Sequence, residues 1–256
     1  MVKPFLLLAL RADDAVADNE YASFLKFGRL GEGELRRIRL EQRPLGHIDL
    51  AGWSGIMVGG GPFNYTDPAG SKSPVQRRVE ADLDGLLDRV VAADFPFLGA
   101  CYGVGALGAH EGAVLDRRYA EPVGPVTVTL TEAGRRDPLL RGLPGSFGAF
   151  TGHKEAVSTL PGNAVHLASS AGCPVQAFRV GSNVYATQFH PELDAEGLCL
   201  RVDAYKHAGY FEPGQAAGIK ALAWRSDVSH APAVLHRFVQ RYAGAARAGL
   251  AVADRG

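Results

Sequence analysis

The stretch "FPFLGACYGVGALGAH" (95–110) indicates how the chain folds and where its chemistry lies. An apolar run ends at Gly99-Ala100, a cysteine follows, and glycines then alternate with small residues, as expected where a buried strand turns into a helix. Two chemistries fit this turn. Gly103, Gly105 and Gly108 form G-x-G-x-x-G, the signature of a dinucleotide-binding loop. Alternatively, Cys101 occupies the place of a nucleophile on a strand-to-helix turn.

Apolar runs alternate with segments of helical period on both sides of this turn. The pattern predicts strands at 4–10, 35–42, 54–61 and 96–100, and helices at 17–28, at 73–94 and from Cys101 onward. Such alternation is typical of a parallel sheet covered by helices on both faces. Ligands bind beyond the carboxyl ends of such strands, so "GGGP" (59–62) and "GACYG" (99–103) should meet at one edge.

The pattern changes between about residues 120 and 190. Short apolar runs separated by Gly, Pro and Asn predict antiparallel strands and turns at 125–130, 164–170, 175–180 and 183–189. Helical period returns at 194–209 and 229–249. The sequence shows neither a repeat nor a linker, so we expect one domain over 1–242, with 243–256 as a tail or a frayed helix end.

Composition excludes several classes of function. Lys and Arg total 27, as do Asp and Glu, and no basic stripe occurs, so nucleic acid is not an expected ligand. Three cysteines argue against a disulfide framework and for a reducing compartment. The apolar run near the N-terminus is too short for a signal-peptide core, and no segment approaches a membrane span. We therefore expect a cytoplasmic protein that does not contact the membrane.

The dinucleotide interpretation lacks its second element. It requires an acidic residue about 20 positions after the glycines, but "PVTVTL" (125–130) contains none and the next acid is Glu132. The usual metal-binding spacings are also missing from the chain. We therefore expect no cofactor and no metal.

The nucleophile interpretation requires a base, and "NVYATQFHPELD" (183–194) offers one. Residues i and i+2 of an extended chain point to the same face, so Glu192 can orient the imidazole of His190. Pro191 keeps His190 out of the helical region. The alternatives are a small buried Cys101 and an exposed histidine and glutamate at a turn. Two such features at one sheet edge favour a Cys101–His190–Glu192 triad.

Four motifs together resemble the class I glutamine amidotransferases of the triad type. They are "VGGGP" (58–62), "GACYG" (99–103), "TGHKEAV" (151–157) and "YATQFHPE" (185–192), and the resemblance covers about residues 5–242. Free-standing proteins that resemble the amidotransferase part of GMP synthase, and the γ-glutamyl peptidases, are most similar. The resemblance implies a flavodoxin-like, three-layer α/β/α fold with a mostly parallel central sheet and additional antiparallel strands.

The resemblance also implies a reaction and the residues that perform it. Cys101 would attack the γ-amide of glutamine and form a thioester, with His190 as acid and base and Glu192 as its orienting carboxylate. The amides of Gly61 and Tyr102 would form the oxyanion hole. The residues expected to contact substrate are Gly60, Gly105, His153 and Glu155.

The sequence departs from the family where the substrate should bind. The family has a glutamine at the position of Gly105, and "GHKEA" (152–156) replaces the usual segment around His153. No synthetase motif is present, so any ammonia would pass to a separate ATP-dependent synthetase. The open alternatives are a stand-alone γ-glutamyl peptidase acting on glutathione-like compounds and a non-catalytic binding protein that retains the triad.

Overall fold

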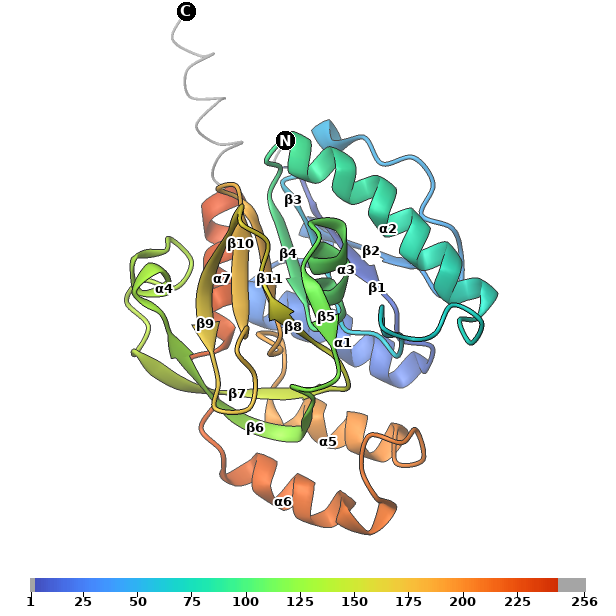
Figure 1. The fold of residues 1–256 in the computed structure, drawn as a ribbon, viewed down its shortest axis with the longest axis vertical. Helices are drawn as coiled ribbons and strands as arrows, with labels where there is room; N and C mark the ends of the chain where they lie inside the picture. Colours follow the sequence, from blue (N-terminus) through green and yellow to red (C-terminus); the bar gives the residue numbers. More distant parts are fainter. Residues whose placement is uncertain (1–2, 244–256) are drawn as a thin grey trace, which may run out of the picture.

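A nine-stranded sheet runs through the computed structural model, which describes residues 3–243 (Figure 1). Its strand order is β2-β1-β3-β4-β11-β10-β9-β6-β7, and the first five strands are parallel to one another. These five are β1 (Phe5–Ala9), β2 (Leu35–Arg39), β3 (Gly55–Val58), β4 (Phe97–Ala100) and β11 (Val184–Thr187). β1, β3, β4 and β11 are buried at every position, which explains why each reads as a continuous apolar run.

Antiparallel strands extend the sheet on one side. They are β6 (Glu121–Leu130), β7 (Ser146–His153), β9 (Ala164–Ser169) and β10 (Ala177–Val180), while β5 (Val114–Asp116) and β8 (Ala156–Thr159) form a separate pair. The expectation of antiparallel strands is correct for β6, β9 and β10. It is wrong for one edge of β11, which pairs parallel with β4.

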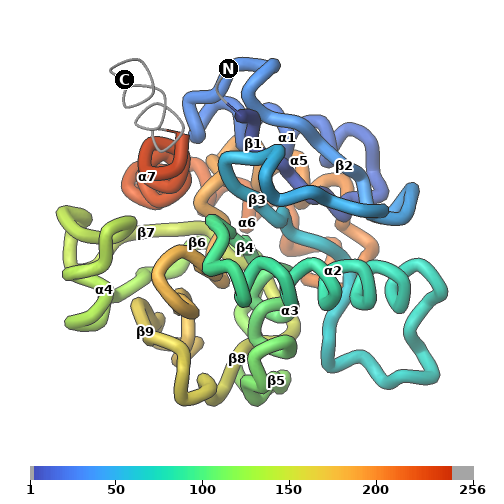
Figure 2. The backbone as a smooth tube through the Cα atoms, turned by 90° about the horizontal axis from the view of Figure 1, so that it is seen from above, coloured from blue at the N-terminus to red at the C-terminus, as the bar shows by residue number. Residues whose placement is uncertain are grey.

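Helices cover both faces of the parallel half. The helices of the described chain are α1 (Asp14–Gly28), α2 (Pro74–Ala92), α3 (Tyr102–His110), α4 (Glu132–Arg136), α5 (Ala195–Ala204), α6 (Ala216–Arg225) and α7 (Pro232–Ala243), of which α4 and α6 lie beside the antiparallel strands. α2 and α3 pack on one face, and α1 and α7 pack on the other, as Figure 2 shows. The three-layer α/β/α architecture with a mostly parallel sheet is therefore confirmed.

Helix α2 shows how the sequence produces a covering layer. Ser73 caps its N-terminus by accepting the amide of Gln76, and Pro74 occupies the first turn. The buried apolar side chains of this helix recur at helical spacing and pack on the sheet: Val79, Leu83, Leu86, Leu87 and Val90. This cluster supports β4 and α3, which carry the cysteine turn.

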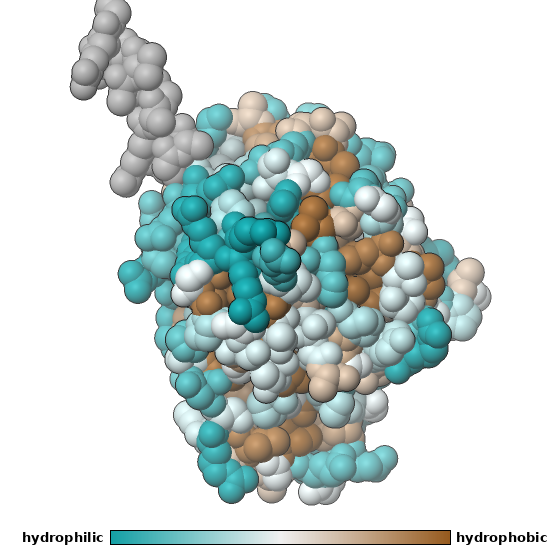
Figure 3. Space-filling view, turned by 60° about the vertical axis from the view of Figure 1, so that its left-hand side comes forward, coloured by the Kyte–Doolittle hydropathy of each residue, from teal (hydrophilic) through white to brown (hydrophobic). Residues whose placement is uncertain are grey.

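No helix within residues 3–243 is long and apolar enough to cross a membrane. Figure 3 shows one face of the molecule, on which hydrophilic residues alternate with separate hydrophobic patches. Of the expected tail at 243–256, only Ala243 lies within the residues that the structure describes. The domain boundary at residue 242 therefore stays a prediction.

Candidate active site

Cys101 lies on a strained turn between β4 and α3. Its φ and ψ angles are 54° and −89°, a conformation that residues other than glycine rarely adopt. The turn is tight because strand and helix nearly touch: a Cβ on Gly99 would approach the Cα of Gly103 to 2.8 Å. A strained, partly exposed cysteine at the start of a helix matches the geometry expected for a nucleophile.

His190 follows β11, the neighbour of β4 in the sheet. Its amide donates to the carbonyl of Phe150 over 3.0 Å, so the chain is fixed beyond the end of the strand. The Nδ1 atom of its ring lies 2.7 Å from Oε1 of Glu192, and both side chains are buried. The expected contact between the side chains at i and i+2 is therefore present in the structure.

The surroundings of His190 keep its ring charged. Burial alone would lower its pKa, but the carboxylate of Glu192 and the neighbouring Cys101 raise that pKa to about 9. Burial would raise the pKa of Glu192, and the charges of His190 and Arg201 outweigh it and lower that pKa. At neutral pH the site therefore holds an imidazolium on an ionised carboxylate, beside the cysteine.

A buried charge network surrounds this pair and includes residues that the sequence interpretation missed. Arg201 on α5 lies 3.1 Å from Oε1 of Glu192 and 3.5 Å from Glu20 on α1. Arg11, just after β1, donates from Nε to Glu20 over 3.0 Å. Arg201 is also 3.3 Å from Nδ1 of His190, but an Nδ1–H donated to Glu192 leaves no lone pair for it.

The glycines after β3 allow a close approach to the site. A Cβ on Gly60 would collide with the guanidinium of Arg11 and come within 2.8 Å of the His190 ring. Gly61 lines the cavities beside Cys101, and Tyr102 begins α3, so its amide lacks a helical partner. Within residues 3–243 neither amide donates to another protein group. Both are therefore available for the predicted oxyanion hole, a role that stays a prediction.

Gly105 lies where two other side chains fill the space. A Cβ there would lie 2.9 Å from Oε1 of Glu155 and 3.0 Å from the Tyr65 ring. Glu155 accepts the backbone amides of Tyr65 and Thr66 over 2.9 and 2.8 Å, and the Tyr65 ring stacks on Tyr102. Glu155 therefore holds a loop over the site.

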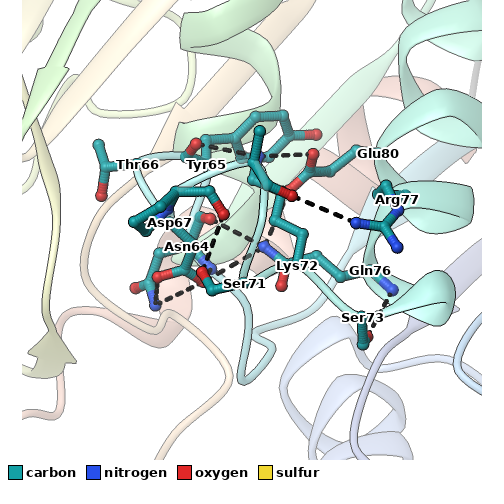
Figure 4. A network of polar contacts seen from close by, with 12 residues as sticks. Asn64, Tyr65, Thr66, Asp67, Ser71, Lys72, Ser73, Gln76, Arg77 and Glu80 are labelled. Carbon is teal, nitrogen blue, oxygen red and sulfur yellow. Dashed lines mark hydrogen bonds and ion pairs between the residues drawn. The ribbon is translucent and has the colours of Figure 1, made fainter.

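That loop has further anchors, which Figure 4 shows from close by. Lys72 donates to the carbonyl of Tyr65 over 3.1 Å and forms an ion pair with Glu80 of α2 over 2.7 Å. Gln76 of α2 donates to the carbonyl of Asn64 over 2.9 Å. The loop between β3 and α2 is thus tied to the helix on one side and to Glu155 on the other.

A second grouping of histidine, carboxylate and thiol lies nearby. The ligand atoms of Glu121, His153 and Cys173 all lie within 4.8 Å of one another, and all three residues are buried. Nε2 of His153 faces Glu121 over 3.0 Å and its Nδ1 faces the Glu155 carbonyl over 2.8 Å. Burial raises the pKa of Cys173 to about 12, so its thiol stays protonated.

This second grouping is built as a structural network. The Glu121 carboxylate also accepts hydrogen bonds from Ser170 and Gln176, each over 2.6 Å, so its oxygens are already occupied. Both ring nitrogens of His153 face protein acceptors, which leaves the ring no free nitrogen for a substrate. His153 therefore lines the cavity beside Cys101, and both of its ring nitrogens are already occupied by protein acceptors.

Two cavities meet at Cys101, and both include Gly61. The first contains Arg11, His190 and Arg201, with Tyr205, Tyr210 and Phe211 from the segment after α5. The second contains Gly105, His153, Glu155 and Gln188. A bound molecule that reaches from one cavity to the other would pass directly over the thiol.

Comparisons with known proteins identify the family of this chain. The family described as "Glutamine amidotransferase class-I" matches residues 31–197. A subunit of the glutamine-hydrolyzing GMP synthase of Thermoplasma acidophilum is 26% identical over 57% of this chain and 66% of that protein. The glutamine-hydrolyzing GMP synthase of Aeropyrum pernix is 37% identical over 38% of this chain. The matches cover less than two thirds of these relatives, and only 19% of the Aeropyrum enzyme.

The fold of this chain is also similar to the folds of solved glutamine amidotransferase structures. A crystal structure of a glutamine amidotransferase from Thermotoga maritima superposes with a TM-score of 0.73 over 93% of this chain and 98% of that one, at 18% identity. The matched family segment contains the cysteine turn, His190 and Glu192. From that match, this chain belongs to the glutamine amidotransferase class-I family.

Proposed function

We propose that this chain hydrolyses the γ-amide of glutamine or of a related γ-glutamyl compound through a thioester on Cys101. The proposal rests on the position of His190, which contacts the Glu192 carboxylate and lines the same cavity as Cys101, a cysteine on a strained turn. In this proposal Cys101 is the nucleophile and His190 the acid and base. Glu192 keeps the imidazole oriented and charged.

Acylation requires Cys101 to react as its thiolate, beside the protonated His190. The sulfur of Cys101 attacks the γ-carbonyl carbon, and the carbonyl π electrons move onto oxygen, where the amides of Gly61 and Tyr102 donate to the developing charge. One such donor is worth roughly 10²–10³ in rate. The C–N bond then breaks, and the leaving nitrogen takes the proton from His190.

Deacylation reverses the proton transfer. A water molecule gives its proton to the neutral His190 and attacks the thioester carbonyl, and the C–S bond breaks to release glutamate. The sum is one amide and one water converted into glutamate and an amine or ammonia. Cys101 and the protonated His190 are regenerated.

We propose positioning roles for two residues that were expected to bind substrate. Glu155 uses both carboxylate oxygens to hold the backbone of Tyr65 and Thr66, so it shapes the pocket through the loop. His153 braces the wall beside Glu121. Gly60 allows Arg11 and His190 to approach the turn, and Gly105 leaves room for Tyr65 and Glu155.

The proposal includes a partner if free glutamine is the substrate. The relatives described above are named as glutamine-hydrolyzing GMP synthases, and the Thermoplasma protein is named as one subunit of that enzyme. By analogy, ammonia made here would pass to a separate ATP-dependent synthetase, and both would work in the cytoplasm.

A stand-alone γ-glutamyl peptidase is the second candidate, and one observation favours it. Tyr65 and Glu155 occupy the space of the side chain that the amidotransferases carry at Gly105, so the glutamyl pocket differs from the family pattern. The chain would then act for its own hydrolytic purpose, without a synthetase.

Product release tests both candidates. Ammonia from L-glutamine and glutamate from a series of γ-glutamyl dipeptides would be measured with the native chain and with Cys101→Ala. Turnover that disappears in the variant supports the proposal, and the preferred substrate distinguishes the candidates. No turnover of any γ-glutamyl compound, even with candidate synthetases added, would favour the non-catalytic binding protein.

A further inference from the structure

Arg11 is a buried cation whose terminal nitrogens are not used. It is only 7% exposed, and it lines the first cavity beside Cys101 and His190. Its Nε donates to Glu20 over 3.0 Å, whereas neither terminal nitrogen donates to any residue within 3–243. One terminal nitrogen lies beside Gly60, which also adjoins the His190 ring, and the Arg11 side chain lines the cavity. Unpaired guanidinium donors in a buried site require an acceptor.

The neighbouring charges do not supply that acceptor. Glu20 accepts from Arg11 only through Nε and also contacts Arg201, and Glu192 contacts His190 and Arg201. Oε2 of each carboxylate accepts no hydrogen bond within residues 3–243, and the two carboxylates lie among three cations. Tyr205 faces the guanidinium with its ring, 5.7 Å away, and Lys154 lies over the ring of Tyr210. The remaining lining is mostly apolar or aromatic, including Val123, Leu198 and Phe211, and Thr151 adds a polar residue.

The position of His190 assigns this cavity to one half of the substrate. A general acid must lie within hydrogen-bond reach of the leaving nitrogen. His190 lines the cavity that contains Arg11, and it does not line the cavity that contains Gly105 and Glu155. The leaving amine therefore lies on the Arg11 side of Cys101, and the glutamyl group lies on the other side.

We propose that Arg11 binds a carboxylate on the leaving amine, so that the substrates are γ-glutamyl amides of amino acids or of similar carboxylate-bearing amines. This inference rests on the proposed hydrolysis at Cys101. Two terminal N–H groups of a guanidinium match the two oxygens of a carboxylate, and the pair forms strongly in a site of low water content. Ammonia as a leaving group would leave these donors unused.

A pair of matched substrates tests the assignment. γ-Glutamylglycine and γ-glutamylmethylamide carry the same scissile bond, and only the first has a carboxylate on its amine. Each would be assayed with the native chain, Arg11→Met, Arg11→Lys and the exposed control Arg36→Met. Circular dichroism would establish that each variant is folded.

The native chain is expected to prefer γ-glutamylglycine in kcat/KM by roughly ten- to hundredfold, the value of a charge-assisted hydrogen-bonded contact. Arg11→Met should abolish the preference, Arg11→Lys should restore part of it, and Arg36→Met should retain it. Equal rates for both substrates with the native chain would overturn the inference. An equal loss for both substrates in Arg11→Met would also overturn it, because Arg11 would then act on the thiolate.

Binding to Cys101→Ala separates this inference from the proposed hydrolysis. Calorimetric titration of this variant with the two compounds should show tighter binding of γ-glutamylglycine, and the difference should vanish when Arg11→Met is added. If the native chain hydrolyses neither compound but the binding difference is present, the hydrolysis fails and the carboxylate site stands. If neither compound binds, or both bind equally, the carboxylate site fails.

Discussion

Oε1 of Glu192 lies 2.7 Å from Nδ1 of His190, and both side chains are buried. Within the protein this carboxylate makes the largest contribution that raises the pKa of the imidazole, to about 9. His190 therefore carries its proton below about pH 9 and loses it above. The proton that the leaving amine requires is present throughout the physiological range.

This relationship predicts the alkaline limb of the pH profile. We expect kcat/KM to fall as the pH rises through about 9, because neutral His190 cannot protonate the leaving nitrogen. Glu192→Gln removes the negative charge, so the pKa of His190 should drop and the falling limb should move to lower pH. Measuring kcat/KM of both proteins at pH values below and above this pKa checks the shift. An unchanged limb in the variant would contradict the assigned role of Glu192.

The contact between Gly99 and Gly103 makes a prediction about the cysteine turn. Gly99→Ala would press a Cβ to within 2.8–3.0 Å of the Gly103 backbone, so the turn must open. We expect a loss of about 1–3 kcal/mol in the free energy of unfolding, the usual cost of overpacking, together with lost activity. Gly103→Ala is the matched control, since its nearest neighbour would be Val58 at 3.6 Å. Denaturant unfolding measures the stability of both variants. Equal free energies of unfolding for Gly99→Ala and Gly103→Ala would contradict the prediction.

Glu155 should control the order of the loop between β3 and α2. Its two oxygens accept the amides of Tyr65 and Thr66, so Glu155→Ala removes both acceptors. We expect hydrogen exchange at these two amides to become about tenfold faster or more, since a hydrogen bond to a charged group is worth at least that factor. Exchange in α7, on the opposite face of the sheet, should not change. Unchanged protection of Tyr65 and Thr66 would show that the anchors in α2 suffice.

The space beside Gly105 predicts a compensating pair of substitutions. Gly105→Gln places a side chain against Tyr65 and Glu155, and it should destabilise the chain by roughly 1–3 kcal/mol. Tyr65→Ala creates room, so the double variant should recover part of this loss. A double-mutant cycle on unfolding free energies measures the coupling. Additive effects would show that Tyr65 does not restrict this position.

The turn at Cys101 and the contact between His190 and Glu192 could be predicted from the sequence because both features are local. Cys101 follows one buried strand, and His190 and Glu192 are two residues apart after another. The parallel pairing of β4 with β11, which the sequence pattern did not predict, brings them to one edge. The charges behind them could not be predicted. Arg11 follows β1, Glu20 lies on α1 and Arg201 on α5, and nothing in their local patterns indicates a contact.

There is a physical reason why the sequence pattern did not predict strand β7. β7 reads "SFGAFTGH", with glycines that allow close approach: a Cβ on Gly148 would collide with the Asp227 carbonyl, and one on Gly152 would meet Val123 at 2.8 Å. These glycines remove the β-branched signal that marks a strand. The parallel edge of β11 was missed because the strand also pairs antiparallel with β10, and its sequence is compatible with both.

Covalent labelling tests most directly whether His190 activates Cys101 for attack on a γ-glutamyl carbonyl. A diazoketone analogue of glutamine would be incubated with the native chain and with His190→Asn, and the modified peptides would be identified by mass spectrometry. We expect a single adduct, at Cys101, that forms roughly a hundredfold more slowly in the variant. Labelling at Cys173 or Cys199 at a similar rate, or labelling of Cys101 that does not depend on His190, would contradict it.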